Sequence, residues 1–337
     1  MKRIAFALVA LVLPALLWAA PQERQKSPDP SGASQFPSYV QKVQPAVVGI
    51  KVQVPRDRPS AHTLGPERRG SGVIFAPDGY ALTVSYVLLD AERIEVWLRD
   101  GRKLPARLVG LDLEVGLGVV KIDAPGPYAS AVLGDSTTVT VGQLTATVGV
   151  DDDGDLVATS GSVQTIRAFA GYWEYMLDRA FVVAPYNPSF GGSPLVNERG
   201  EVIGIASLRL GDPPLVNLAI PIEKFLPGKD ELIREGRVVS RKPRPWLGLY
   251  TVPAEDGGVV VTGVSPVGPA GSAGFQRGDR IVRLDGEPVG SQEEFYTRLW
   301  QTQVGQEITL VVVRDARFHA ITVRSADRYR FFRTTEK

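Results

Sequence analysis

Serine hydroxyls are the nucleophiles that this chain offers, because its 337 residues include no cysteine and only two histidines. The segment 187–195 reads Asn-Pro-Ser-Phe-Gly-Gly-Ser-Pro-Leu and contains two of the serines, Ser189 and Ser193. A serine cleaves an amide only when a base within hydrogen-bond reach accepts its proton. Any hydrolytic chemistry therefore depends on which base the fold brings to these hydroxyls.

The same segment resembles the nucleophile loop of trypsin-like serine proteases, which reads Asn-Pro-Gly-Asn-Ser-Gly-Gly-Pro-Leu. In that loop the serine attacks the scissile carbonyl, and glycine amides surround the oxyanion. Gly191 stands at the serine position, and Gly192 keeps the glycine that follows it. Ser189 and Phe190 replace the Gly-Asn pair before it. The resemblance implies an oxyanion-loop remnant, made of Ser189, Phe190 and Gly192, without a nucleophile.

Two further segments resemble the HtrA (Deg) protease family, and each lacks its catalytic residue. Residues 82–87 read Leu-Thr-Val-Ser-Tyr-Val where the family has Leu-Thr-Asn-x-His-Val, so Tyr86 stands at the histidine. Residues 108–122 resemble the family's Val-Gly-x-Asp-x-x-x-Asp-Leu-Ala-Val-Leu-Lys-Ile, with Gly116 at the second aspartate. The resemblance implies a degenerate member, a pseudoprotease in which Tyr86, Gly116 and Gly191 replace the triad.

Hydrolysis by displaced groups would need a different base. The serines nearest the expected site are Ser85, Ser189 and Ser193. His62 lies in the loop before Gly70 and His319 lies in the last strands, outside the segments that the fold brings to the nucleophile loop. Lysines at 51 and 121 follow alternating strand patterns, which place them on a solvated face, whereas a catalytic lysine needs burial to lower its pKa. An active HtrA-type endopeptidase with non-standard catalytic residues stays the alternative.

Two aromatic rings stand where the resemblance places polar catalytic groups. Tyr86 takes the position of the histidine, and Phe190 directly precedes the position of the serine. Because these two positions face each other in the family fold, we expect the rings to fill the former substrate cleft. The alternative is that one or both rings point to solvent.

The segment 39–226 must position these residues. Short runs rich in Val, Ile and Leu alternate there with Gly, Pro and Asp turns about every ten residues, which predicts a pair of β-barrels. The split between the barrels is predicted near 123–128, where Pro125-Gly126-Pro127 cannot continue a strand. The fold class is mainly β, and the resemblance implies a trypsin-like double six-stranded β-barrel followed by an α+β PDZ domain.

The predicted PDZ domain covers residues 246–326, with a helix over 292–301 and a final strand pair around 307–323. Its Leu247-Gly248-Leu249 turn would let backbone amides converge on the terminal carboxylate of a peptide that adds a strand to the sheet edge. Phe295 and Leu299 have the i, i+4 spacing of one helix face. They are candidates to wall the pocket for the last peptide side chain, although the same spacing suits residues that pack the core.

The remaining segments predict export and tethering. Residues 1–20 carry Lys-Arg before an apolar run, the order of a signal peptide or N-terminal anchor. Residues 21–38 read as a flexible tether, 227–245 as a helix and linker, and 327–337 as a tail. The expected location is the periplasm or cell envelope.

Composition excludes several classes of function. A formal net charge of +1, from 38 basic and 37 acidic residues, gives no excess charge for nucleic acid. No metal site or cofactor is expected, because two isolated histidines without cysteine supply no ligand cluster. The acidic cluster 151–155 lacks the twelfth-position glutamate of a calcium loop and predicts a solvated hairpin tip.

The resemblance also implies partners. These are peptides or unfolded exported proteins with free C-termini, bound in envelope protein quality control or regulation. It further implies a homotrimer or a mixed assembly with an active relative. A structural or assembly protein whose peptide groove stays empty is the other alternative.

Overall fold

The computed structural model describes residues 36–332 as parts of one compact unit. The predicted signal segment (1–20), residues 21–35 of the predicted tether and residues 333–337 of the predicted tail lie outside the described residues. Among the residues described, no helix combines the length and the hydropathy needed to cross a membrane.

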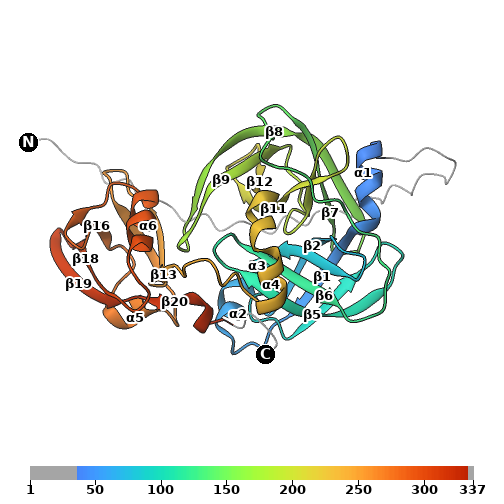
Figure 1. Ribbon diagram of the computed structural model, residues 1–337. Coiled ribbons are helices and arrows are strands. Elements are labelled where there is room, and N and C mark those ends of the chain that lie inside the picture. The colour runs from blue at the N-terminus through green and yellow to red at the C-terminus, as the bar shows by residue number, and fades with distance from the viewer. Residues whose placement is uncertain (1–35, 333–337) are drawn as a thin grey trace, which may run out of the picture. The chain divides into compact units, whose positions relative to one another are not determined.

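The first barrel is a closed sheet in the order β1-β2-β3-β6-β5-β4 (Figure 1). Its strands are β1 (Val47–Gln53), β2 (Glu67–Ile74), β3 (Tyr80–Val84), β4 (Arg93–Trp97), β5 (Lys103–Asp112) and β6 (Leu117–Ile122). Short helices α1 (Ser38–Val43), α2 (Pro59–Leu64) and α3 (Ser85–Leu88) and the 3-10 turn η1 (Gln44–Ala46) accompany it. Turns at 77–79 and 99–101 connect β2 to β3 and β4 to β5.

The second barrel is closed in the order β10-β11-β12-β9-β8-β7. Its strands are β7 (Leu144–Val150), β8 (Leu156–Gly171), β9 (Tyr175–Ala184), β10 (Pro194–Val196), β11 (Val202–Leu210) and β12 (Val216–Pro221). The acidic cluster 151–155 forms the turn between β7 and β8, where the Asp151 carboxylate accepts hydrogen bonds from the amides of Asp153 and Asp155. These two six-stranded barrels are the ones that the sequence predicts.

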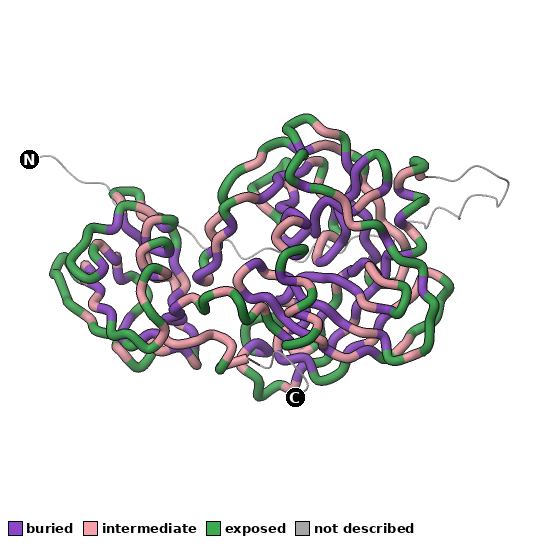
Figure 2. The backbone as a smooth tube through the Cα atoms, viewed as in Figure 1, coloured by how far each residue is buried: buried purple, intermediate pink, exposed green. Residues whose placement is uncertain are grey.

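Burial explains why these segments form barrels. The strands that cross both interiors carry Val, Ile, Leu and Ala, and Figure 2 shows the buried residues concentrated along them. Strand β8 is different, because most of its sixteen residues are only half buried or exposed. It continues past the barrel with β9 as a long hairpin, which Figure 1 shows extending toward α6 (Gln292–Gln301), and β9 contacts that helix. We call residues Gly171, Tyr172, Trp173 and Glu174 the hairpin tip.

The chain leaves the second barrel through two 3-10 turns, η2 (Ile222–Lys224) and η3 (Leu226–Gly228), and then α4 (Lys229–Glu235). Proline at position 227 sits in the second turn, where its ring is compatible with the first residues of a helix. Helix α4 contacts β5 and ends at Gly236, whose positive φ of 76° suits a helix C-cap.

The C-terminal domain is a six-stranded sheet with α5 (Pro269–Ala273) and α6. The strands are β14 (Leu249–Pro253), β15 (Val259–Val264), β16 (Arg280–Leu284), β18 (Glu307–Arg314) and β19 (Arg317–Arg324), with β17 (Glu287–Pro288) beside β16. Strand β13 (Pro245–Trp246) pairs with β20 (Ala326–Asp327), which precedes η4 (Arg328–Arg330). Because β14 stands at one end of the sheet order, one of its edges has no strand beside it.

Candidate functional site

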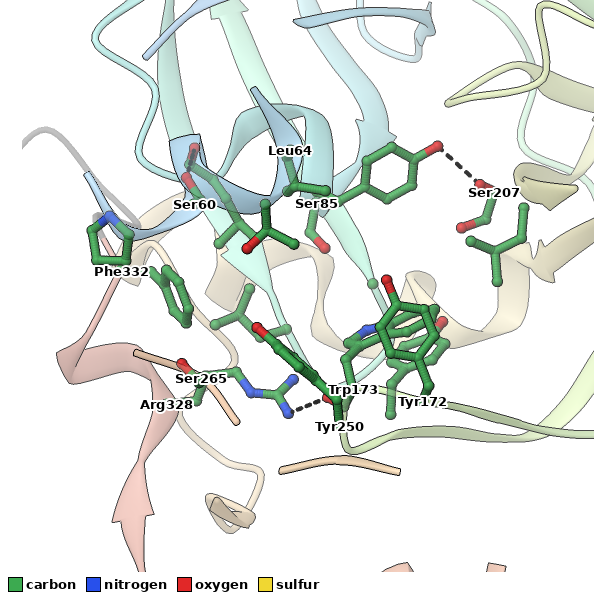
Figure 3. Close-up of a pocket in the computed structure, with 18 of the residues that line it drawn as sticks. Ser60, Leu64, Ser85, Tyr172, Trp173, Ser207, Tyr250, Ser265, Arg328 and Phe332 are labelled. Atoms are coloured by element: carbon green, nitrogen blue, oxygen red, sulfur yellow. Dashed lines mark hydrogen bonds between the residues drawn. The ribbon is translucent and has the colours of Figure 1, made fainter. Parts of the chain in front are cut away.

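The phenol of Tyr86 fills the space in which a side chain at position 191 would lie. A Cβ atom added to Gly191 would stand 2.9 Å from the Tyr86 Oη. This hydroxyl donates a hydrogen bond to the Ser207 carbonyl over 2.9 Å, drawn in Figure 3, and burial raises the pKa of Tyr86 well above its ordinary value. Tyr86 is therefore a hydrogen-bond donor held away from any role as a base.

Gly116 lies in the turn between β5 and β6 in a conformation that favours glycine. Its φ is +83°, and an added Cβ would stand 2.9 Å from the Tyr175 Oη. Tyr175 is 3% exposed, and its hydroxyl donates to the Val115 carbonyl over 2.7 Å. The buried ring of Tyr175 thus packs against the position at which the resemblance places the aspartate.

Hydrogen bonds at Ser189 and Gly191 fix the backbone of the nucleophile loop. In trypsin-like enzymes the oxyanion is bound by the amide of the nucleophile and by the amide two residues before it. The second of these corresponds to Ser189, whose amide donates to the Asn187 Oδ1 over 2.8 Å. The Gly191 carbonyl accepts from the Ser71 amide over 2.7 Å. One of the two oxyanion donors is therefore already used inside the loop.

The serines near the loop contact backbone carbonyls or lie away from both histidines. Ser193 is buried, and its hydroxyl donates to the Ser189 carbonyl. Ser85 is buried at the start of α3. His62 is exposed on α2, and His319 is exposed on β19. Neither histidine is among the residues that line the cleft. The described residues bring no histidine to a serine hydroxyl.

A cavity of about 400 Å³ remains where the two barrels and the C-terminal domain meet (Figure 3). Tyr86, Gly116 and Ser207 line it from the barrels, and Tyr250 and Ser265 line it from the C-terminal domain. The walls are mainly apolar and aromatic. The cavity has room for a small apolar group or a peptide side chain.

Phe190 lines the cavity without closing it. Its ring packs against Tyr186 at 5.9 Å between centroids and is half buried. The sequence led us to expect that Phe190 and Tyr86 together fill the cleft. In the structure Tyr86 occupies the nucleophile position, whereas Phe190 forms part of the wall of an open cavity.

The predicted carboxylate-binding turn of the C-terminal domain holds a carboxylate that belongs to this chain. The amide of Leu247 donates to the Glu174 Oε2 over 2.9 Å, and the amide of Leu249 donates to the Oε1 over 2.7 Å. Gly248 between them has a φ of +82°, and an added Cβ would lie 2.8 Å from the Gly268 Cα. The turn therefore presents two backbone amides to one carboxylate, and Glu174 supplies that carboxylate.

Backbone groups of the hairpin tip continue along the same groove. The Thr251 amide of β14 donates to the Tyr172 carbonyl over 2.7 Å. The Tyr296 hydroxyl donates to the Gly171 carbonyl over 2.7 Å, and the Gln292 side-chain Nε2 donates to the Thr251 carbonyl over 2.6 Å. The hairpin tip is thus held between β14 and α6.

The face of α6 that meets the hairpin differs from the one singled out in the sequence. Phe295 and Leu299 are fully buried in the hydrophobic cluster of the C-terminal domain, so the structure places both in the core. Gln292 and Tyr296 make the polar contacts with the groove instead. They have the same i, i+4 spacing, and sequence reasoning missed them because spacing alone does not show which face looks into a groove.

The environment of Glu174 combines deep burial with hydrogen-bond donors. Burial raises the pKa of the Glu174 carboxyl, while Arg328 and the amides of residues 247–249 oppose that rise. The Arg328 guanidinium also donates to the carbonyls of Trp173 at 3.0 Å and of Glu174 at 2.8 Å, and Figure 3 draws a bond from this side chain. Such a buried carboxyl is tolerated only because these donors are in place.

Ion pairs join the linker to the first barrel beside Gly116. The Arg241 guanidinium donates to both oxygens of Asp112 over 2.7 and 2.8 Å. Arg244 pairs with Glu114 at 2.6 Å. Burial raises the pKa of Glu114, and Arg244 opposes this rise. The linker is therefore fixed to the turn that contains Gly116.

Comparison with known proteins agrees with this architecture. Residues 70–205 match the trypsin-like peptidase domain, and residues 245–324 match the PDZ domain. The chain is 33% identical to a probable periplasmic serine endoprotease DegP-like of Halomonas elongata, over 80% of this chain and 59% of that protein. It is 31% identical to the serine endoprotease DegS of Escherichia coli K12, over 82% and 81% of the two chains.

Solved structures give the same result. The HtrA-type protease AlgW with a decapeptide has a TM-score of 0.53 and 27% identity, over 86% of this chain and 98% of that one. A serine endoprotease from Yersinia pestis has a TM-score of 0.53 and 28% identity, over 86% and 96%. The chain spans about six tenths of the length of the Halomonas relative. With its two barrels and PDZ domain, the chain belongs to the HtrA (Deg) family of trypsin-like serine proteases.

Proposed function

We propose that this protein is an HtrA-like pseudoprotease, which binds peptides or exposed protein C-termini through its PDZ domain and does not cleave them. The observation that carries the proposal is the position of the Tyr86 phenol, 2.9 Å from where a side chain on Gly191 would begin. A proton-accepting imidazole and a nucleophilic hydroxyl are both replaced at this point. Without triad members, at most the residual acceleration of binding and an oxyanion hole remains, on the order of 10³ to 10⁴ over water.

The state of the oxyanion loop supports the same proposal. The Ser189 amide already donates to the Asn187 side chain, and the Ser193 hydroxyl donates to a backbone carbonyl. A substrate carbonyl would therefore meet neither an activated nucleophile nor a complete pair of free donors. Relatives that share this architecture are named serine endoproteases.

Binding is the activity that the remaining machinery supports. The Leu247-Gly248-Leu249 turn presents amides to a carboxylate, and β14 is the edge strand to which an extended peptide can add. AlgW, a relative of known structure, holds a decapeptide. Ligands of this chain are accordingly peptides or exported, unfolded proteins with a free C-terminus.

The setting that we propose is the cell envelope. Relatives are named periplasmic endoproteases, and the N-terminal 1–20 segment has the composition of an export signal. There the protein serves protein quality control or regulates an active relative, as a homotrimer or within a mixed assembly. Loss of hydrolysis suits a holding or regulatory role, because a bound chain is retained intact.

The experiment that tests the loss of hydrolysis is casein turnover by the full exported chain. We expect no cleavage above the background of a buffer control, and the same result for the Ser193→Ala variant. Turnover by the parent that Ser193→Ala abolishes would support an active endopeptidase with non-standard catalytic residues. Turnover that survives this change points to Ser85 or Ser189, which can be tested by the corresponding alanine variants.

A peptide titration tests the binding role. A labelled decapeptide with an apolar last residue and a free C-terminal carboxylate is compared with its C-terminal amide. We expect amidation to weaken binding at least tenfold, because the amide removes the charge that the turn accepts. Binding that ignores amidation would favour a structural or assembly protein. Since the chain itself fills the turn, the titration includes the variants described next.

A further inference from the structure

The hairpin tip lies in the PDZ groove in the manner of a bound peptide. From these contacts we infer that it is an internal ligand, with the Glu174 carboxylate in the site of a peptide's C-terminal carboxylate, so that peptides must displace it to bind. The inference rests on the proposed function, because a C-terminal peptide is the competing ligand. The occupancy itself is a property of the described residues alone.

The carboxylate contact has the features of a specific site. Each oxygen of Glu174 accepts one backbone amide, from Leu247 over 2.9 Å and from Leu249 over 2.7 Å. The Glu174 residue is only 2% exposed, so an incoming carboxylate has no room beside it. One turn cannot serve two carboxylates at once, and the two ligands therefore exclude each other.

The backbone contacts follow the path that an added strand would take. The edge strand β14 gives the Thr251 amide to the Tyr172 carbonyl, over 2.7 Å. On the opposite side Tyr296 of α6 donates to the Gly171 carbonyl, over 2.7 Å, and the Glu174 amide donates to the Tyr296 hydroxyl over 3.2 Å. The groove is thus engaged along its length and not only at the carboxylate.

The hairpin tip contains one residue, Glu174, in a left-handed backbone conformation. Glu174 has a φ of +53°, a region that a residue other than glycine occupies only when surrounding contacts impose it. Part of the favourable free energy of docking the hairpin tip is therefore offset by the cost of this backbone conformation of Glu174. The apparent affinity of the groove for a peptide equals its intrinsic affinity multiplied by the fraction of molecules in which the hairpin tip is undocked.

The first arm of the test is a binding measurement on the full chain. Fluorescence anisotropy of the free-carboxylate decapeptide is recorded with the parent, Glu174→Ala, Glu174→Gln and a control, Glu198→Ala. The Glu198 side chain is exposed in the turn between β10 and β11. We expect Glu174→Ala to bind at least tenfold tighter than the parent, Glu174→Gln to be intermediate, and Glu198→Ala to match the parent.

The second arm needs no peptide and therefore separates the two proposals. Hydrogen exchange of the amides at 247–251 is compared in the same four proteins, and faster exchange is expected only in the two Glu174 variants. Unchanged exchange in both variants, with peptide affinity equal to or below that of the parent, would overturn the internal ligand. Faster exchange together with no peptide binding in any variant would uphold the internal ligand and refute the proposed peptide-binding function.

Discussion

Gly116 shows at the scale of a residue why the triad position cannot simply be refilled. Its φ of +83° is costly for any other residue, and Tyr175 leaves no space for a Cβ. At Gly191 the backbone is permissive, and only the phenol of Tyr86 stands in the way. The two positions at which we propose that catalytic residues were replaced therefore differ in their local packing.

Gly116→Asp should lower the free energy of unfolding by about 2–4 kcal/mol, through left-handed strain plus overpacking against Tyr175. The matched control is Gly142→Asp, because Gly142 has a φ of +87° and nothing within 4 Å of an added Cβ. The control should lose only about 1 kcal/mol, the cost of the backbone conformation. Urea unfolding measures both variants, and equal losses would show that Tyr175 does not restrict the site.

At the scale of an element, an ion pair joins the start of β16 to the end of β18 in the PDZ sheet: Asp279 precedes β16, and Arg314 is the last residue of β18. Its side chain is fully buried and accepts two bonds from the Arg314 guanidinium, over 2.6 and 2.7 Å. Burial raises the pKa of Asp279, but Arg314 and the Gln276 amide outweigh it, so the pKa lies below its usual 3.8. A lowered pKa contributes stability above the unfolded-state value, and this contribution is lost as the pH falls.

Asp279→Asn should therefore cost about 2 kcal/mol of unfolding free energy at pH 7, because the Arg314 charge loses its partner. The difference between parent and variant should shrink as the pH falls below about 4 and disappear below the lowered pKa of the folded carboxylate, where the parent is also protonated. Urea unfolding of parent and variant, measured at pH 7 and at several pH values below about 4, tests this expectation. A difference that stays constant across this range would contradict the assigned role of the ion pair.

Individual elements were predicted from the sequence to different extents. Helix α6 spans the predicted 292–301, since Ser291 caps it by accepting the Glu294 amide at 3.1 Å. The helix expected within 227–245 begins at Lys229, because the 3-10 turns η2 and η3 come first. Strand periodicity predicted two barrels, but it could not show that β8 and β9 extend beyond their barrel.

The arrangement of domains could not be predicted because it depends on contacts between distant segments. Glu174 follows Tyr-Trp in an ordinary hairpin turn, and nothing local distinguishes it from a solvated carboxylate. The same holds for Asp112 and Arg241, which are 129 positions apart. The triad replacements that we propose, by contrast, follow from the sequence alone, because each one departs from a motif of fixed spacing.

At the scale of the whole molecule, these contacts should make the barrels and the PDZ domain unfold together. We expect the parent to show one calorimetric transition. The double variant Arg241→Ala, Glu174→Ala should show two, because both changes remove contacts that join the domains. Asp112, whose side chain is 4% exposed, loses its partner in this variant. Arg102→Ala is the control, since the Arg102–Asp100 pair is about half exposed. Two transitions in the parent would mean that the domains are already independent.

The most direct test of the missing catalytic machinery is the mass of the intact protein after incubation with a fluorophosphonate, which labels serines activated by a base. The position of the Tyr86 phenol and the bonding of the Ser193 hydroxyl predict an unchanged mass, with an active trypsin-like protease labelled in parallel. A stoichiometric adduct on Ser193, Ser189 or Ser85 would contradict the proposal that this chain is a pseudoprotease.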